Sequence, residues 1–258
     1  MANVATTKST EKIYKLGGFL YWVPWEEDKS IDEVFVTELA SSAAIGDTSI
    51  TVDQVTAFPA TGTIYISGET GTRAYTAITG TAITLATLTA AHSAEAIVEV
   101  VRVSGATVTS YNGFSCFGYS AQSMFNPGIE ESEPIITESG KVITGFAPPD
   151  EPTFTVDLLQ SDIDSLAFML QKDVESATEN GATVIKSTSA FKDIAAIYVA
   201  RSVGPSGAES VFVFKFPHLQ RTGSEDITFN NEPRQVSVSF RCMDDKVDGY
   251  KYKILVEE

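Results

Sequence analysis

The sequence predicts a mainly β fold of the α+β kind: a β-sandwich or β-barrel host domain with one flanking helix and a small inserted all-β domain. Three observations predict it. The stretches 211–216 and 235–242 alternate apolar and polar residues, as half-buried strands do. Residues 39–101 hold short apolar stretches separated by turn residues. Helical spacing of apolar residues is found at 161–174.

The two alternating stretches each have one face that we expect to be buried and one that we expect to be wet. The side chains expected on the wet faces are Lys215, Ser237, Ser239 and Arg241. These faces hold no group of His, Cys and carboxylate residues of the kind that catalysis needs. They favour assembly over catalysis.

Length and charge narrow the choice of function. The 258 residues exceed the commonest domain size of about 100 to 150 residues, so one large or two small domains are expected. The chain has 34 acidic and 18 basic residues and a formal charge of −16. Such a charge keeps a protein soluble and repels phosphates. We therefore do not expect the protein to bind DNA in a sequence-specific way.

The two cysteines and the N-terminal region point to an intracellular, reduced protein. Cys116 and Cys242 lie in alternating apolar surroundings, where we expect buried free thiols rather than a disulfide framework. The apolar stretch 19–23 is short and is followed by Pro24. It fits neither a secretory signal nor a membrane-spanning helix.

Residues 39–101 are predicted to form a compact all-β module inserted into a host domain made of residues 1–38 and 102–258. Their composition shifts to Ala, Thr, Ile and Gly, and turn residues separate the apolar stretches. The strands expected in the module are 49–52, 62–66, 73–78, 82–85 and 96–101.

The host domain begins with an aromatic strand at 13–25, in which two adjacent glycines indicate a bulge or bend. After the module, residues 111–124 are predicted as a strand broken by Gly113 and Gly118. Four further strands are predicted at 153–158, 195–200, 211–216 and 235–242, and the last of these is the terminal strand of the chain.

A long acidic stretch interrupts the host domain at 126–152. Segments 134–137 and 141–144 flank the turn-forming sequence Glu138-Ser139-Gly140, which predicts a hairpin arm. Long loops of this kind are either functional or disordered, and the sequence leaves both alternatives open.

The predicted helix begins at Ser161 as its N-cap. Its apolar residues recur at helical spacing and are expected to pack on a sheet. They are Ile163, Leu166, Ala167, Leu170 and Val174.

The histidines and cysteines do not form a recognisable chemical motif. His92 and His218 each lack a second His or Cys at ligand spacing, so both are expected to be structural residues in turns. Spacing alone leaves a pair of Cys116 and His218 open, although Cys116 lies among aromatic residues with no activating charge nearby in sequence.

The grouped carboxylates also favour structural roles. Acid–base catalysis needs carboxylates that share a pocket and differ in pKa, whereas these groups fall in a helix first turn or in expected loops. They are Asp162 with Asp164, Asp244 with Asp245, and Glu130 with Glu131 and Glu133. We therefore expect a protein that is not an enzyme and has no catalytic residue, cofactor or metal.

Two parts of the chain resemble bacteriophage proteins. Residues 43–52, 58–66 and 91–94 resemble a small β-module that recurs as an insertion in virion proteins. In the host domain, the order of elements and three stretches are similar to the major tail tube proteins of long-tailed, siphovirus-like phages. These stretches are 153–170, 212–217 and 227–234.

This resemblance implies a structural virion protein that forms stacked hexameric rings, and so a tail tube through which DNA passes into the host. The implied partners are further copies of the chain, the tape measure protein and other tail proteins, with DNA only as non-specific passing cargo. The implied location is the virion tail, assembled in the host cytoplasm. The module would project outward, although its early position departs from that family, where added domains more often follow the tube domain.

Two other functions remain open from the sequence. One is a virion surface, decoration or tail-tip protein whose β-module binds host glycans or proteins. Grouped exposed aromatic residues would favour it, but the module has few besides Phe58, Tyr65 and Tyr75. The other is a hydrolase with an unrecognised site.

Overall fold

The computed structural model describes residues 18–105, 107–128, 135–136, 142–143, 151–158, 174–179, 182–185, 193–203, 209–222 and 236–257. All regular elements in these ranges are strands, which confirms the mainly β prediction. The predicted helix at 161–174 lies outside the described residues, except that Val174 begins a strand. Within the described ranges, no helix has the length and apolar character needed to span a membrane.

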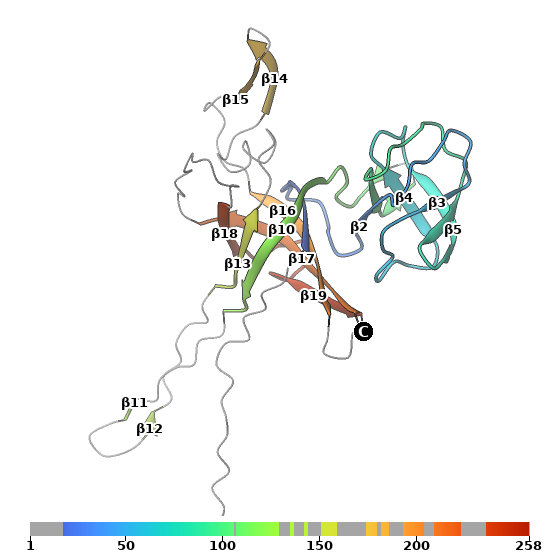
Figure 1. The fold of residues 1–258 in the computed structure, drawn as a ribbon. Coiled ribbons are helices and arrows are strands. Elements are labelled where there is room, and N and C mark those ends of the chain that lie inside the picture. Colours follow the sequence, from blue (N-terminus) through green and yellow to red (C-terminus); the bar gives the residue numbers. More distant parts are fainter. Residues whose placement is uncertain are drawn as a thin grey trace, which may run out of the picture.

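Seven strands form the main sheet, and six of them close into a small barrel. The antiparallel pairings run in the order β16, β1, β10, β13, β18 and β17, and β17 pairs with β16 to complete the ring. Figure 1 shows these strands at the centre of the molecule. The strands of this sheet are β1 (Gly18–Pro24), β10 (Ser115–Asn126), β13 (Thr153–Leu158), β16 (Ile194–Val203), β17 (Glu209–Arg221), β18 (Val236–Cys242) and β19 (Lys253–Glu257).

Strand β17 is long enough to take two partners along one edge. Its residues 211–215 pair with β19, and its residues 219–221 pair with β18. Within the described part of the chain, β19 pairs with β17 alone, so its outer edge is open.

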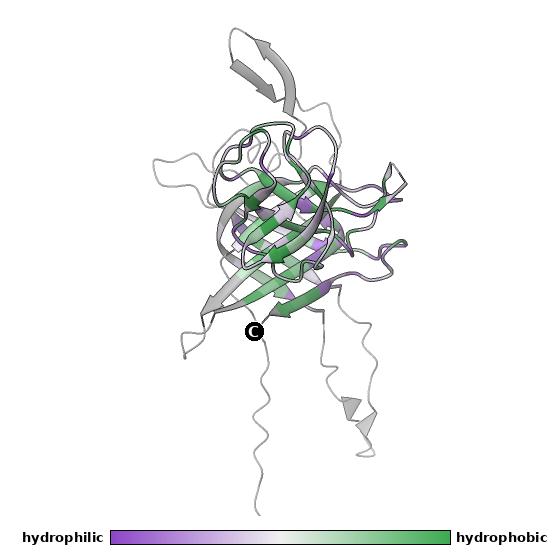
Figure 2. Ribbon diagram, turned by 90° about the vertical axis from the view of Figure 1, so that its right-hand side faces the viewer, coloured by the Kyte–Doolittle hydropathy of each residue, from purple (hydrophilic) through white to green (hydrophobic). Residues whose placement is uncertain are grey.

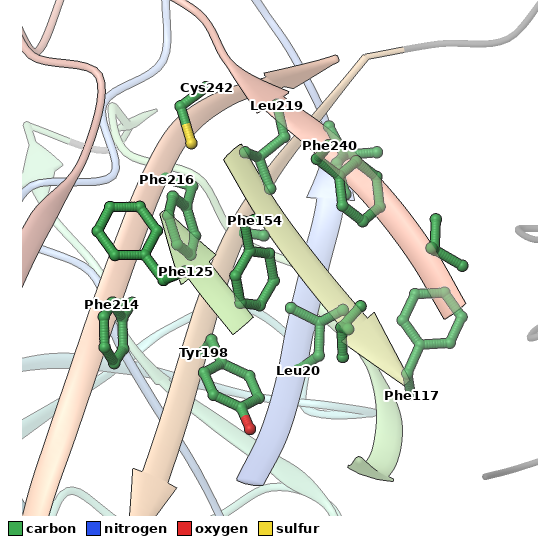
Figure 3. Packing of buried hydrophobic residues seen from close by; sticks show 14 of the residues in the cluster. Leu20, Phe117, Phe125, Phe154, Tyr198, Phe214, Phe216, Leu219, Phe240 and Cys242 are labelled. Atoms are coloured by element: carbon green, nitrogen blue, oxygen red, sulfur yellow. The ribbon is translucent and has the colours of Figure 1, made fainter. Parts of the chain in front are cut away.

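Aromatic rings fill the barrel, as the alternation at 211–216 predicted. Phe214 and Phe216 point inward from β17, and Phe154 of β13 stacks on Phe216 with ring centroids 4.7 Å apart. Figure 3 shows these rings gathered between the strands, with Tyr198 and Phe125 beside them. The core cluster is therefore built from residues far apart in the sequence, which joins all six strands of the barrel.

The segment between β1 and β10 forms a second, six-stranded sheet in the order β2, β7, β4, β5, β6, β3. A bridge between Leu39 and Val52 joins the two ends of this order, and the sheet has its own core cluster. We call this part, Phe35–Val100, the module. Its strands are β2 (Phe35–Glu38), β3 (Ser49–Thr51), β4 (Gly62–Ile66), β5 (Arg73–Thr79), β6 (Ala82–Leu85) and β7 (Ile97–Val100).

The module lies beside the barrel and is joined to it by a third apolar cluster. The segment before the module contributes Ile31 and Val34 to this cluster, and β2 contributes Val36. These residues pack with outward-facing residues of β1, β16 and β17, such as Ile197 and Val213. In Figure 2, which looks from the module's side, hydrophobic residues follow the strands and hydrophilic ones gather in the loops.

Three short hairpins complete the described structure. β8 (Val103–Ser104) pairs with β9 (Thr107–Val108), β11 (Ile135–Ile136) with β12 (Val142–Ile143), and β14 (Val174–Glu179) with β15 (Ala182–Ile185). The β11–β12 pair confirms the predicted hairpin arm. In Figure 1, β11–β12 lies below the barrel and β14–β15 lies above it.

Two expectations about the barrel strands were wrong. β10 continues through Gly118 as one strand, although its register with β1 shifts there, since Phe19 pairs with Tyr119 and Tyr21 pairs with Cys116. A glycine inside a strand marks such a bulge without ending the strand. Lys215 is fully buried rather than wet, because the segment leading into the module covers the outer face of β17. The alternation of faces was right, but the outer face of β17 is not exposed to water.

Candidate functional site

His92 belongs to a buried polar cluster inside the module. Its Nε2 lies 2.8 Å from Oε2 of Glu69 and its Nδ1 lies 3.1 Å from the carbonyl oxygen of Ser67. Both ring nitrogens of His92 therefore have a polar partner inside the module. The side chains of His92 and Glu69 are each 1% exposed, which leaves no room for a substrate.

The carboxylate of Glu69 is the centre of this cluster. Arg73 and the hydroxyl of Thr89 donate to it, as do the backbone N–H groups of Thr89 and Ala90. Burial favours the neutral acid, but the hydrogen bonds from Thr89 and His92 outweigh burial and lower the pKa of Glu69 to about 2. The cluster ties the β4–β5 turn to the segment after β6, which is a structural role.

His218 lies on the barrel and pairs with Asp193. The distance from His218 Nε2 to Asp193 Oδ2 is 2.6 Å, and the imidazole stacks on Trp25 with ring centroids 4.2 Å apart. A carboxylate–imidazole pair assists nucleophilic catalysis when a hydroxyl or thiol lies within reach of the imidazole. Its Nε2, the nitrogen that would serve a nucleophile, is already bonded to Asp193.

The cysteines have other surroundings. Cys116 donates a hydrogen bond to Glu38, which also accepts one from Tyr21. Spacing left a pair of Cys116 and His218 open, but in the structure Cys116 contacts Glu38 and His218 contacts Asp193. Cys242 points into the barrel core (Figure 3), and burial raises the pKa of its thiol to about 12. Such a thiol carries almost no thiolate at neutral pH.

The described carboxylates from the grouped set make structural contacts. Asp245 accepts hydrogen bonds from the N–H groups of Val247 and Asp248, and Asp248 accepts from the N–H of Ile31 and the hydroxyl of Ser30. Asp244 lies 3.9 Å from Lys251. Within the described residues, no three His, Cys, Asp or Glu side chains are grouped so that they could hold a metal ion. The candidates Asp162, Asp164, Glu130, Glu131 and Glu133 fall outside the described residues.

Two charged residues whose burial the sequence did not predict, Lys215 and Glu99, lie where the module joins the barrel. Lys215 places its Nζ 3.8 Å from the centroid of the Phe35 ring and donates to the carbonyl of Asp32. Burial lowers the pKa of Lys215 to about 7, and the nearby charge of Asp32 opposes this shift. The ammonium group therefore fixes the entry segment of the module against β17.

Glu99 fixes the exit segment in a similar way. Its carboxylate accepts the backbone N–H groups of Gly113 and Phe114 at 2.8 and 2.7 Å, and the residue is 0% exposed. Burial raises the pKa of Glu99 to about 7, although both hydrogen bonds act in the opposite direction. The junction therefore holds two buried ionisable side chains, Lys215 and Glu99, each beside a segment that joins the module to the barrel.

The open edge of β19 is the surface feature with the clearest potential for binding. Ile254 and Val256 are 40% and 54% exposed, and they lie opposite Phe214 and Phe212 of β17. Exposed apolar residues on an unpaired strand edge favour pairing with another chain. The apolar stretch 254–256 could have identified a strand, but not that its outer edge is open.

Comparison with protein-family models, with curated proteins and with solved structures found no match to this chain. The function is therefore inferred from the chain's own residues and geometry.

Proposed function

We propose that the protein is a structural subunit of a long-tailed phage, which forms stacked hexameric rings and thereby the tail tube. Further copies of the chain, the tape measure protein and other tail proteins are its proposed partners, and DNA passes through the channel as cargo. Assembly takes place in the host cytoplasm and the product resides in the virion tail. The sequence resemblance and the closed aromatic barrel support this proposal.

The observation that carries the proposal is the hairpin β11–β12. Its four described residues, Ile135, Ile136, Val142 and Ile143, are all apolar and pair in register, and the hairpin lies away from the barrel (Figure 1). A two-stranded hairpin by itself is at best marginally stable in water, so contact with another chain would stabilise it. A neighbouring subunit in a stack of rings supplies such a contact.

The second hairpin and the charge fit the same assembly. β14–β15 lies at the other end of the barrel, so arms extend from both ends, where rings that stack must meet. The net charge of −16 would repel DNA phosphates from a channel wall and prevent the cargo from sticking.

The host-binding alternative has less support. Tyr75 is 2% exposed, and its hydroxyl donates to the carbonyl of Pro59. Phe58 is partly buried against the module core. Of the three aromatic residues that would favour binding by the module, two therefore serve its packing.

Negative-stain electron microscopy of the purified protein over a concentration series tests the proposal. We expect rings and hollow tubes with knobs on the outside. Small dispersed particles at every concentration would contradict the tube.

A variant with all four hairpin residues changed to serine tests the arm separately. We expect it to fold and to lose tubes, since the neighbouring subunit loses its apolar partner. The control is Val247→Ser, which removes an exposed apolar side chain from a turn outside both hairpins. Normal tubes from the fourfold variant would show that the arm does not hold the rings together.

A further inference from the structure

Among the strands that the structure describes, β19 combines an edge without a partner strand with exposed apolar side chains. Five large apolar side chains are exposed in the described part of the chain, and two of them, Ile254 and Val256, are on this short strand. They lie on the face that β17 turns toward the barrel interior, because their cross-strand neighbours are Phe214 and Phe212. Natural edge strands usually avoid this combination, since it invites pairing with a further strand.

The sequence of the strand is complementary to itself. β19 reads Lys-Ile-Leu-Val-Glu from Lys253 to Glu257, with a cation at one end and an anion at the other. When two copies pair antiparallel about Leu255, Lys253 of each copy faces Glu257 of the other. Ile254 then faces Val256. Opposite charges and branched apolar residues are both favourable directly across a strand pair.

We propose that β19 is a self-association surface, through which two copies of this chain pair antiparallel about Leu255 and form a two-fold symmetric dimer. The two main sheets then join into one sheet that crosses the dyad. The interface covers the open backbone edge and the exposed Ile254 and Val256 of both copies.

The contacts of Lys253 within its own chain leave it able to pair with Glu257 of a second copy. Its Nζ contacts Oδ1 of Asp32, which also accepts the hydroxyl of Tyr250 at 3.2 Å. The Lys253 side chain is still 39% exposed, and an ammonium group has three donors. It can therefore keep Asp32 and also face a second carboxylate.

This dimer goes beyond the proposed tube and does not depend on it. A two-fold contact joins identical patches and stops at two copies, whereas rings and tubes need contacts between different patches. The dimer is therefore a state of the unassembled protein that protects the edge, and it has to separate before β19 can serve any other contact. Its failure would leave the tube proposal standing, and the absence of tubes would leave the dimer standing.

Sedimentation velocity over a concentration series tests the association. We expect a dimer for the wild type and no dimer for Val256→Lys. For Glu257→Lys we expect a dissociation constant raised about tenfold, because two attractive cross-strand pairs become repulsive. Ile45→Lys is the matched control, since Ile45 is 68% exposed and lies in the module. A monomeric wild type, or Val256→Lys and Ile45→Lys dimerising equally, would overturn the proposal.

Cysteine cross-linking tests the register without disturbing the core, because both positions are exposed. Residues directly opposite have Cβ atoms about 4.5–5.5 Å apart, and diagonal neighbours are about 7–8 Å apart. A disulfide needs the shorter separation. An oxidised mixture of Ile254→Cys and Val256→Cys should therefore give several times more linked dimer than either variant alone.

The other possible results of the cross-linking experiment also test the proposed register. Efficient linking of Ile254→Cys by itself would mean a register shifted from Leu255, which overturns the proposed pairing. Linking in neither the mixture nor the single variants would overturn it as well. Wild type oxidised in parallel gives the background from Cys116 and Cys242, which are half-buried and buried.

Discussion

Glu99 shows how one buried side chain controls the path of the chain. Its carboxylate lies in the interior and binds two successive backbone N–H groups, those of Gly113 and Phe114. Without an acceptor these groups would be costly to bury, since an unsatisfied donor costs about 1–3 kcal/mol. The same burial makes the carboxylate itself expensive to ionise, which is why its pKa rises to about 7.

The pH dependence of stability follows from this shift. The unfolded chain releases the Glu99 proton near its ordinary pKa of 4.5, whereas the folded protein keeps it until about pH 7. Rising pH through this window therefore favours the unfolded state, and the free energy of unfolding falls by up to about 3 kcal/mol. Below pH 4.5 and above pH 7 this residue adds no slope.

Replacing Glu99 by Gln should remove this slope. At pH 5 we expect the variant to be about 1–2 kcal/mol less stable than wild type, since the amide cannot accept from both N–H groups. At pH 8 the difference should shrink or reverse, because wild type then carries a buried charge. Urea unfolding at both pH values measures this. The exposed Glu33→Gln should follow wild type, and a Glu99→Gln curve with the wild-type slope would contradict the assignment.

The central strands of the barrel meet at a point where only glycine fits. A Cβ atom built on Gly18 would lie 2.2 Å from the carbonyl oxygen of Val199 and 2.9 Å from Cα of Ala200, both backbone atoms of β16. Gly18 pairs with Ala200 on one side and Ser120 on the other. β1 can therefore lie between β10 and β16 because this residue has no side chain.

Gly18→Ala should consequently force β1 and β16 apart. We expect a loss of about 2–4 kcal/mol, at the upper end of single substitutions, because the clash is with backbone rather than with a flexible side chain. Thermal unfolding of the variant measures the loss. A suitable control is Gly46→Asn, at a turn residue of positive φ with no atom close to its added Cβ, which should cost only the backbone strain of about 1 kcal/mol. A wild-type melting temperature for Gly18→Ala would show that the strands are not this close.

Strands with strict alternation were predictable from the sequence, and those defined by distant partners were not. The predicted strand 153–158 and the hairpin arm agree with the structure. The β14–β15 hairpin was missed, although Asn180-Gly181 between two short stretches is a strong hairpin signal. The predicted helix at 161–174 stays a prediction.

The features that join distant parts of the chain had no local signal. The alternation along β17 places Lys215 on the outer face of the barrel, as predicted. Asp32 and Phe35 cover it there, and Asp32 is 183 positions away in the sequence. The barrel closes through three residue pairs between β17 and β18. Periodicity identifies which face of a strand is apolar, but not which segment covers the opposite face.

At the scale of the whole molecule, two sheets with separate cores are connected through the strand pair β2–β7. β2 and β7 enter and leave the module as an antiparallel pair, from Phe35 opposite Val100 to Glu38 opposite Ile97. Beyond them, the N–H of Leu39 donates to the carbonyl of Ala96 at 3.0 Å. Ile97 and Glu99 belong to the junction with the barrel, so a cut that removes the module must leave them in place.

Residues 40–95 can therefore be replaced by Asn-Gly, which joins Leu39 to Ala96 through a two-residue hairpin turn. Val98 and Val100 lose the module core that buries them, so both should be changed to Thr to keep the new hairpin soluble. We expect a barrel that unfolds cooperatively, because its core cluster contains no residue of the module. Circular dichroism with thermal melting measures this.

The same variant separates decoration from assembly. If the module projects outward from a tube, the shortened protein should form tubes that lack the outer knobs in negative stain. Val98→Thr with Val100→Thr in the full chain is the control, and it should destabilise the module by about 1–3 kcal/mol for each buried hydroxyl that lacks a partner. A folded, shortened barrel that forms no tubes would mean that the module takes part in the contacts between subunits.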